Sequence, residues 1–251
     1  KGDGLALGAD LGTSLSVIDL YQLPGAWGVS SVSPFCVKVE AALRAGGLPF
    51  RRMPGVPFRG PRGKVPWIGL DGELIHDSQR ILDELTRRGR LTLDAHLDEA
   101  ARMRGHAIRR MLEEGTDFLL VYLRWEPDDA WAVYQPVLAA ELPPVVGPVL
   151  LGHLRRGMRK MLWSQGTGRL DHERIEELAC QDYAALSAEL GDREFLFGSA
   201  PTTFDATAYA WVASTLAFPH PSRVKSALLA DARLVAYRER FEDRFFRDGP
   251  R

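Results

Sequence analysis

The sequence contains few cysteines and no cluster of metal-binding residues. Cys36 and Cys180 are the only two in 251 residues, and their separation gives neither a CxxC pair nor the ligand spacing of a metal site. None of the six histidines belongs to a metal motif, and the sequence has no glycine-rich phosphate-binding loop. We therefore expect no metal and no nucleotide, and we expect the chain to occupy a reducing compartment, the cytoplasm.

The sequence also lacks an excess of charge and a long apolar run. The 32 basic and 33 acidic residues leave a net charge of −1, so nucleic acid is not an expected partner. The most apolar uncharged run, residues 142–154, contains three prolines and is far shorter than the ~20 residues of a transmembrane helix. We expect no membrane span.

Residues 1–16 carry little structural signal. They hold Asp3 and Asp10 among glycines and small residues, without the basic start and apolar block of a signal peptide. We interpret this segment as a tail or a tag remnant. The rest of the chain has the composition of a globular protein and is long enough for two domains of unequal size.

Short apolar runs separated by turns predict a mixed α/β domain over residues 17–90. Ser33-Pro34 suits a helix start, since serine can accept a bond from a free N–H and proline fits the first helical position. Asp71-Gly72 tolerates the positive φ angles of a two-residue hairpin turn. The predicted elements are strands at 17–21, 50–53, 65–70 and 73–75, with helices beginning near Ser33 and Ser78.

Beyond Gly89 helical patterns replace strand patterns, which predicts a second domain, all-helical, over residues 91–251. The clearest helix covers about 170–190, where apolar residues recur at helical spacing before Gly191. Thr202 lies three positions before Asp205, as in a capping box, and the segment 206–217 is apolar enough to be buried on all sides.

Four short motifs follow one another between residues 33 and 78. In this order they resemble the N-terminal domain of the glutathione transferases, which has a thioredoxin fold. The helix start Ser-Pro-Phe-Cys-x-Lys-Val-Glu and the later stretch 191–198 are similar to the branch with failed-axon-connections and metaxin-like proteins. The resemblance implies a thioredoxin-like N-terminal domain followed by a helical C-terminal domain. The four motifs are Ser33-Pro34-Phe35-Cys36, Lys64-Val65-Pro66-Trp67, Asp71-Gly72 and Asp77-Ser78.

The resemblance implies a catalytic role for Ser33, which lies where Ser-type and Cys-type members keep their hydroxyl or thiol. A helix N-terminus favours an anion, so a hydroxyl that donates to the glutathione sulfur there would help to keep it a thiolate. Lowering a thiol pKa by about two units from ~8.5 corresponds to roughly 2.7 kcal/mol. A serine that only caps its helix looks the same in sequence, and the two roles can coexist.

Two neighbouring positions have alternative interpretations. Cys36 matches the second cysteine of a redox CxxC, but Ser33 replaces the first, which excludes dithiol exchange through that pair. We therefore expect Cys36 to be buried and inert. Tyr21 lies near the position of the catalytic tyrosine in Tyr-type members, although an aromatic residue at the end of a strand is more often part of a core.

Five further residues are implied to bind glutathione. Val65-Pro66 resembles the cis-proline turn whose backbone pairs with the tripeptide, and Asp77-Ser78 resembles the pair that receives its γ-glutamyl end. The alternative for Asp77-Ser78 is an ordinary helix cap. Lys64 belongs to a stretch, 41–70, with six basic and no acidic residues, which suits an anionic ligand or is a solvated basic loop.

The resemblance leaves three functions open. The first is a transferase that conjugates glutathione to a small hydrophobic electrophile, in a pocket lined by Phe118, Tyr122 and Trp125 unless these are core residues. The second is a non-catalytic binding or assembly module of metaxin type, and the third is a glutathione-dependent lyase or dehalogenase. Retention of Val65-Pro66 and Asp77-Ser78 favours a chain that still binds glutathione. A homodimer is the expected assembly.

Overall fold

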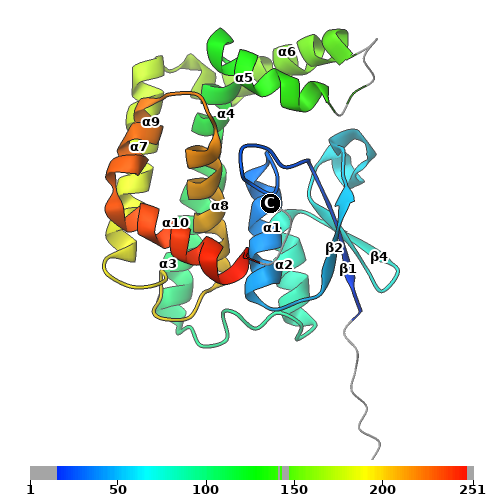
Figure 1. The fold of residues 1–251 in the computed structure, drawn as a ribbon, viewed down its shortest axis with the longest axis vertical. Helices are drawn as coiled ribbons and strands as arrows, with labels where there is room; N and C mark the ends of the chain where they lie inside the picture. The colour runs from blue at the N-terminus through cyan, green and yellow to red at the C-terminus, as the bar shows by residue number, and fades with distance from the viewer. Residues whose placement is uncertain (1–15, 141, 143–146, 248–251) are drawn as a thin grey trace, which may run out of the picture.

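The computed structural model describes residues 16–140, 142 and 147–247. A small α/β unit built on a four-stranded sheet lies beside a larger group of helices (Figure 1). This arrangement confirms the predicted fold class, a thioredoxin-like N-terminal part followed by a helical part. The predicted tail 1–16 lies outside the described residues except for Ser16, and the predicted domain boundary near residue 90 stays a prediction.

The sheet has the strand order β2-β1-β3-β4. β1 runs parallel to β2, whereas β3 is antiparallel to both β1 and β4. Because parallel strands need a crossover, α1 connects β1 to β2, while the antiparallel pair needs only the Asp71-Gly72 turn, whose residues have φ angles of 52° and 82°. The bounds are β1 Ile18–Gln22, α1 Pro34–Ala45, β2 Phe50–Pro54, β3 Trp67–Leu70, β4 Glu73–His76 and α2 Ser78–Arg87.

Two short 3₁₀ turns, η1 (Pro57–Arg59) and η2 (Pro61–Gly63), join β2 to β3. They fold tightly against the start of β3. A Cβ atom on Gly60 would lie 2.4 Å from the Lys64 carbonyl oxygen and 2.6 Å from the Trp67 ring, so this position needs glycine. The third strand begins at Trp67 rather than at Val65 as predicted, because Pro66 has no N–H to donate to a neighbouring strand.

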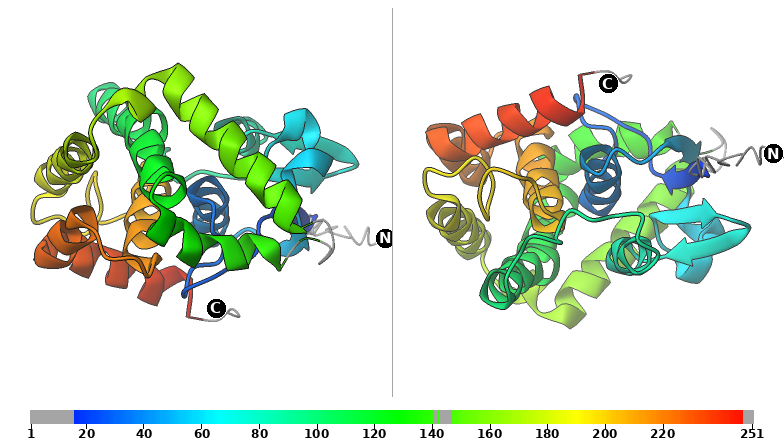
Figure 2. Two further views of the ribbon diagram at one scale, coloured as in Figure 1. Left: turned by 90° about the horizontal axis from the view of Figure 1, so that it is seen from above. Right: turned by 90° about the horizontal axis from the view of Figure 1, so that it is seen from below.

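The C-terminal part is helical throughout the described residues. α3, the π-helical η3 and α4 follow one another without a break, and Figure 1 shows α3 and α4 at opposite ends of this long segment. α5 and α6 lie across one end of the molecule, as Figure 2 shows from above. The bounds are α3 Glu99–Arg110, η3 Met111–Thr116, α4 Asp117–Trp125, α5 Asp128–Ala139, α6 Gly147–Gln165, η4 Thr167–Arg169, α7 His172–Leu190, α8 Thr203–Ala217, α9 Arg223–Ala230 and α10 Ala232–Phe245.

Helix α8 joins the two parts of the core. Twelve of its fifteen residues are buried, and it packs against α1 of the sheet unit as well as against helices of its own part. The predicted capping box is confirmed: the Thr202 hydroxyl accepts from the Asp205 N–H, and the Asp205 carboxylate accepts from the Thr202 N–H. Gly105 permits the crossing with α3, because a Cβ atom there would lie 2.4 Å from the Phe204 ring.

Within the described part of the chain, no helix is both long and apolar enough to cross a lipid bilayer.

Candidate functional site at the start of α1

Ser33 precedes α1 and is half-buried. Its carbonyl accepts the first bonds of the helix, from the N–H groups of Cys36 and Val37. Among the described residues its hydroxyl does not cap the helix, because no N–H of the first turn donates to it. The simple capping interpretation of Ser33 is therefore wrong, and its hydroxyl lies at the positive end of the α1 dipole without binding an N–H group of the first turn.

Cys36 is completely buried one turn into α1. Burial raises the pKa of its thiol to about 11, although hydrogen bonding with the Leu23 backbone and the Ser33 hydroxyl opposes this rise. The thiol stays protonated at neutral pH, which confirms the expectation that Cys36 is buried and makes it a poor nucleophile. The Ser33 hydroxyl thus lies within hydrogen-bonding reach of the Cys36 thiol.

The strand register brings distant parts of the sequence to this end of the sheet. Tyr21 on β1 pairs with Trp67 on β3, and Trp67 pairs with His76 on β4. One residue further along, Pro66 and Asp77 are therefore neighbours. The Val65–Pro66 peptide bond is cis, as the resemblance implies.

Asp77 and Ser78 lie at the start of α2. Asp77 is the cap, since its Oδ1 accepts from the N–H groups of Gln79 (3.1 Å) and Arg80 (3.0 Å). The ordinary-cap interpretation is therefore right for Asp77. Ser78 is buried, and its hydroxyl makes no hydrogen bond with any described residue. The Ser78 hydroxyl and the other oxygen of Asp77 stay free to bind a polar ligand.

Tyr21 and Lys64 differ in how close they come to this site. Tyr21 alternates with the buried residues Leu20 and Gln22, and its ring stacks on Trp67 at 4.9 Å on the sheet face away from α1. The structure therefore supports a packing role for Tyr21 rather than a catalytic one. Lys64 is exposed directly before the cis bond, where its charge can reach an anion at the sheet end.

A second group of buried charges lies on α1 and was not predicted. The Glu40 carboxylate is fully buried and accepts from the Arg44, Arg52 and Gln22 side chains. Burial alone would raise the pKa of Glu40, but the hydrogen bonds from Arg52 and Arg44 lower it below its ordinary value. Arg51 likewise pairs with Asp19, so three of the six basic residues in 41–70 neutralise protein carboxylates instead of serving a ligand.

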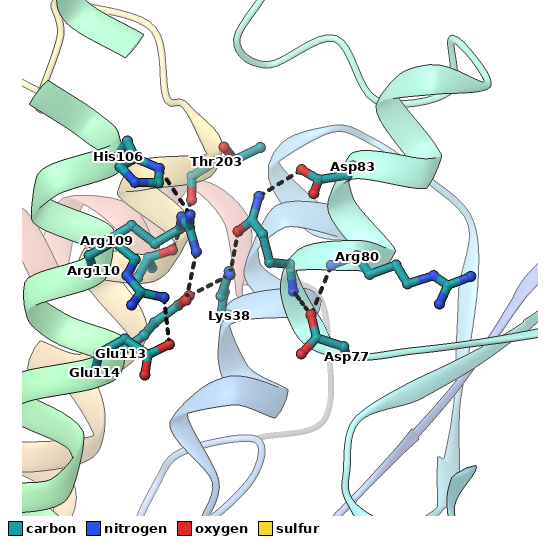
Figure 3. Close-up of polar contacts among 12 residues, drawn as sticks. Lys38, Asp77, Arg80, Asp83, His106, Arg109, Arg110, Glu113, Glu114 and Thr203 are labelled. Carbon is teal, nitrogen blue, oxygen red and sulfur yellow. Dashed lines mark hydrogen bonds and ion pairs between the residues drawn. The ribbon is translucent and has the colours of Figure 1, made fainter. Parts of the chain in front are cut away.

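The most extensive polar network links the sheet unit to the helical part (Figure 3). Lys38 of α1 is completely buried, and its Nζ donates to Glu113 Oε1 at 2.5 Å and to Gln79 Oε1 at 2.7 Å. Arg109 donates to the second oxygen of Glu113 at 3.0 Å. Because Gln79 follows Ser78 directly, this network fixes the start of α2 relative to α1. A lysine among the apolar residues of 34–45 was the only sequence signal for it.

Of the three residues predicted to line a pocket for the electrophile, one belongs to the core. Trp125 is only 9% exposed and packs on Trp131 and Tyr134, within a cluster that also contains Val32. The core interpretation is therefore right for Trp125. Phe118 and Tyr122 are half-buried, so part of each residue is exposed to solvent.

Trp27 extends this aromatic cluster from the β1–α1 loop. Its ring lies 6.0 Å from the ring of Tyr134 and 5.2 Å from that of Phe218. A cavity of about 690 Å³ lies under the same loop, between residues 22–30 and the end of β2 at 52–54. None of the predicted site residues lines this cavity, so it is separate from the site at the start of α1.

Comparison with known proteins agrees with this geometry. The model of the glutathione S-transferase N-terminal domain matches residues 34–131, and that of the glutathione S-transferase C-terminal domain matches residues 179–241. The chain belongs to the glutathione transferase superfamily.

Three relatives show how varied the matching proteins are. The chain is 33% identical over 204 residues to Failed axon connections of Drosophila melanogaster, covering 77% of this chain but only about half, 49%, of that protein. It is 28% identical over 237 residues to isoprene-epoxide–glutathione S-transferase of Rhodococcus sp. (strain AD45), covering 91% of this chain and 99% of that enzyme. It is 29% identical to the Metaxin-2 homolog of Caenorhabditis elegans, covering 68% and 75% of the two chains.

A solved structure supports the fold. A glutathione S-transferase of Ceriporiopsis subvermispora in complex with glutathione superposes with a TM-score of 0.61 at 16% identity, covering 94% of this chain and 99% of that one. At this identity the likeness concerns the fold alone.

Proposed function

We propose that this chain binds glutathione at the start of α1 and transfers its thiolate to a small electrophile. The observation that supports the proposal is the strand register, which brings Pro66 beside Asp77 and Ser78 at the end of the sheet where β1 ends and the chain continues toward Ser33. Two hydroxyls there, on Ser33 and Ser78, bind no N–H of a neighbouring helix. These are the groups that a peptide thiol with a carboxylate tail requires.

Each part of glutathione has a partner in this proposal. The sulfur lies at the positive end of α1, where the Ser33 hydroxyl donates to it and lowers its pKa. The peptide pairs with the backbone of Val65. The γ-glutamyl carboxylate binds the Ser78 hydroxyl at the positive end of α2, its ammonium binds Asp77, and Lys64 attracts the tripeptide's net negative charge.

The electrophile we propose is an epoxide or a molecule of similar size and polarity. The support is the Rhodococcus relative, which is named for an isoprene epoxide and matches this chain over 99% of its own length. A glutathione-dependent lyase or dehalogenase would use the same thiolate on another substrate. We further propose a cytoplasmic homodimer, since superfamily members commonly pair and the two cysteines are free.

A second candidate function is a non-catalytic binding or assembly module. Two observations favour it: the similarity to Failed axon connections and the Metaxin-2 homolog, and the aromatic cluster of Trp27, Trp125 and Tyr134 next to the start of α1. In such a module the site at Ser33 and Ser78 would be unused.

The ionisation of bound glutathione separates these candidates. We expect the thiol pKa of bound glutathione, followed by ultraviolet absorbance of the thiolate, to fall about two units below ~8.5. Ser33→Ala should raise it again and lower turnover of an epoxide, whereas Ser164→Ala, an exposed serine on α6, should change neither. An unshifted thiol pKa and no turnover would favour the module.

A further inference from the structure

Asp117 is a carboxyl group without a partner. It is the first residue of α4, it is half-buried, and it makes no hydrogen bond or ion pair with any residue that the structure describes. Neighbouring carboxylates are all engaged: Glu113 pairs with Lys38 and Arg109, Glu114 with Arg110, and Asp182 accepts from the Thr116 hydroxyl. Asp117 is thus the exception in a segment of well-paired acids.

Two contacts indicate that Asp117 lies beside the N-terminal end of α1, at the same height along the helix axis. Lys38 of α1 binds Glu113, and Val121 of α4 packs on the cluster that contains Val32, just before α1. Positions therefore decrease along α1 as they increase along η3 and α4, so the two helical segments are antiparallel. From the Lys38–Glu113 pair, Ser33 lies five residues back, about 7.5 Å along the axis of α1, and Asp117 lies four residues forward, at most about 6 Å along the axis of η3 and α4.

The helix itself changes geometry at this point. The π-helical segment η3, in which the wider turn replaces the α-helical one, ends at Thr116, directly before Asp117. Such segments occur mostly as short insertions in α-helices and are frequent at functional sites. Asp117 follows this wider turn directly. It lies four positions from both Glu113 and Val121, which puts the three residues on about the same face of the helical segment.

The surroundings of Asp117 favour its neutral form. Burial raises its pKa to about 7, since the attraction of Arg124 is opposed by Glu113 and Glu114 on the same helix. From the packed helices, the other titratable groups near enough to influence it are two buried tyrosines. They are Tyr134 of α5 and Tyr183 of α7. A carboxyl that is protonated in part of the molecules at neutral pH can donate a proton.

We propose that Asp117 is the general acid of this site and that the electrophile is one whose oxygen gains negative charge on attack, as in an epoxide. This inference rests on the proposed glutathione site at Ser33. It adds a second catalytic residue, contributed by the helical part, to a site whose other residues all come from the sheet unit.

The reaction is then balanced without a further reactant. The thiolate sulfur, whose proton has passed to solvent, forms a bond to one epoxide carbon. The carbon–oxygen bond at that carbon breaks, and its electron pair stays on oxygen. Asp117 transfers its proton to this oxygen, giving a thioether alcohol, and the carboxylate takes up a proton from solvent before the next turnover.

The test compares two electrophiles with saturating glutathione. Styrene oxide needs a proton on its oxygen, whereas 1-chloro-2,4-dinitrobenzene loses chloride and needs none. Asp117→Asn should lower the kcat for styrene oxide, divided by the kcat for 1-chloro-2,4-dinitrobenzene, by about 10²-fold or more. The wild-type kcat for the epoxide should fall as pH rises through about 7, because the acid form is lost, and the variant should lack this fall. Asp243→Asn, an exposed acid of α10 paired with Arg247, is the matched control.

Each outcome decides the matter. An unchanged ratio in Asp117→Asn, with both substrates turned over, would overturn the acid role and leave the transferase function intact. A wild-type protein that binds glutathione but turns over neither electrophile would overturn the acid role and the transferase function while leaving the binding site intact. Absence of glutathione binding would overturn both proposals.

A stability measurement tests the carboxyl without any substrate. Because the folded-state pKa is raised, the folded protein keeps a proton on Asp117 that the unfolded chain loses, so wild-type stability should fall as pH rises from 3.8 to about 7. Asp117→Asn should remove this part of the pH dependence. Parallel curves for the two proteins would mean that Asp117 is already ionised and cannot serve as the acid.

Discussion

Lys38 and Glu113 form an ion pair that joins α1 of the sheet unit to the helical part, with 2.5 Å between Nζ and Oε1 and almost no exposure of either side chain. The two side chains differ in the partners that each would keep if the other were removed. Glu113 also accepts from Arg109, whereas the other hydrogen-bond partner of Lys38 among the described residues is the neutral Gln79. Lys38 is the side chain that would be left with an uncompensated buried charge.

This asymmetry predicts unequal effects on stability. Glu113→Gln should lower the free energy of unfolding by about 3–5 kcal/mol, because Lys38 then lacks a counter-charge. Lys38→Met should cost less, about 1–3 kcal/mol, since Arg109 still balances Glu113. Urea unfolding of both variants measures the difference, and Glu114→Gln is the exposed control. Equal losses for the two variants would contradict the asymmetry.

The capping box of α8 should contribute to stability and not to chemistry. Asp205 accepts from the Leu196 N–H at 2.8 Å, the Thr202 N–H at 2.9 Å and the Thr202 hydroxyl at 2.6 Å. Thr202→Ala should cost about 1–2 kcal/mol of unfolding free energy. Glutathione affinity of the folded variant should match the wild type. A selective loss of affinity without a loss of stability would show that α8 takes part in binding.

Cys36 should resist thiol reagents in the folded protein. Its side chain is fully buried and the pKa of its thiol is about 11, so little thiolate exists at pH 8. Cys180 is half-buried, and burial also raises its pKa, so it should react slowly but before Cys36. A disulfide reagent should therefore label one thiol in native protein and two in denaturant. Labelling of both at the same rate in the native state would show that α1 opens readily.

Ser33→Cys should convert the start of α1 into a redox-active site. The new thiol would lie at the positive end of the helix, three residues before Cys36, and should have a pKa below ~8.5. We expect mixed disulfide formation with glutathione disulfide, measured by mass spectrometry. Ser164→Cys on α6 is the control for an exposed thiol without this environment. No exchange in a folded Ser33→Cys protein would contradict the placement of the glutathione sulfur.

The local features of the fold could be predicted from sequence because each depends on neighbouring residues. The turn at Asp71-Gly72 has both φ angles positive, as that dipeptide allows, and Thr202 with Asp205 forms a capping box from side chains three positions apart. The role of Ser33 could not be settled in this way. A serine before Pro34 suits a cap, and only the three-dimensional arrangement shows its hydroxyl near Cys36 instead.

The residues that sequence reasoning missed depend on partners far along the chain. Lys38 pairs with Glu113, 75 positions later, and its place among the apolar residues of α1 does not identify that partner. Asp117 is likewise recognisable only once its neighbours are known to be apolar or already paired. Trp125 was a candidate for the pocket, but it packs on Trp131 of the next helix, a contact that depends on how α4 and α5 cross.

Calorimetric titration with glutathione, repeated for Ser78→Ala, tests the central claim most directly. The account predicts micromolar-to-millimolar binding by the wild type and about tenfold weaker binding by Ser78→Ala, the loss of one hydrogen bond to a charged group. Ser164→Ala should bind as the wild type does. No heat of binding for the wild type, or equal affinity in Ser78→Ala, would contradict a glutathione site at this end of the sheet.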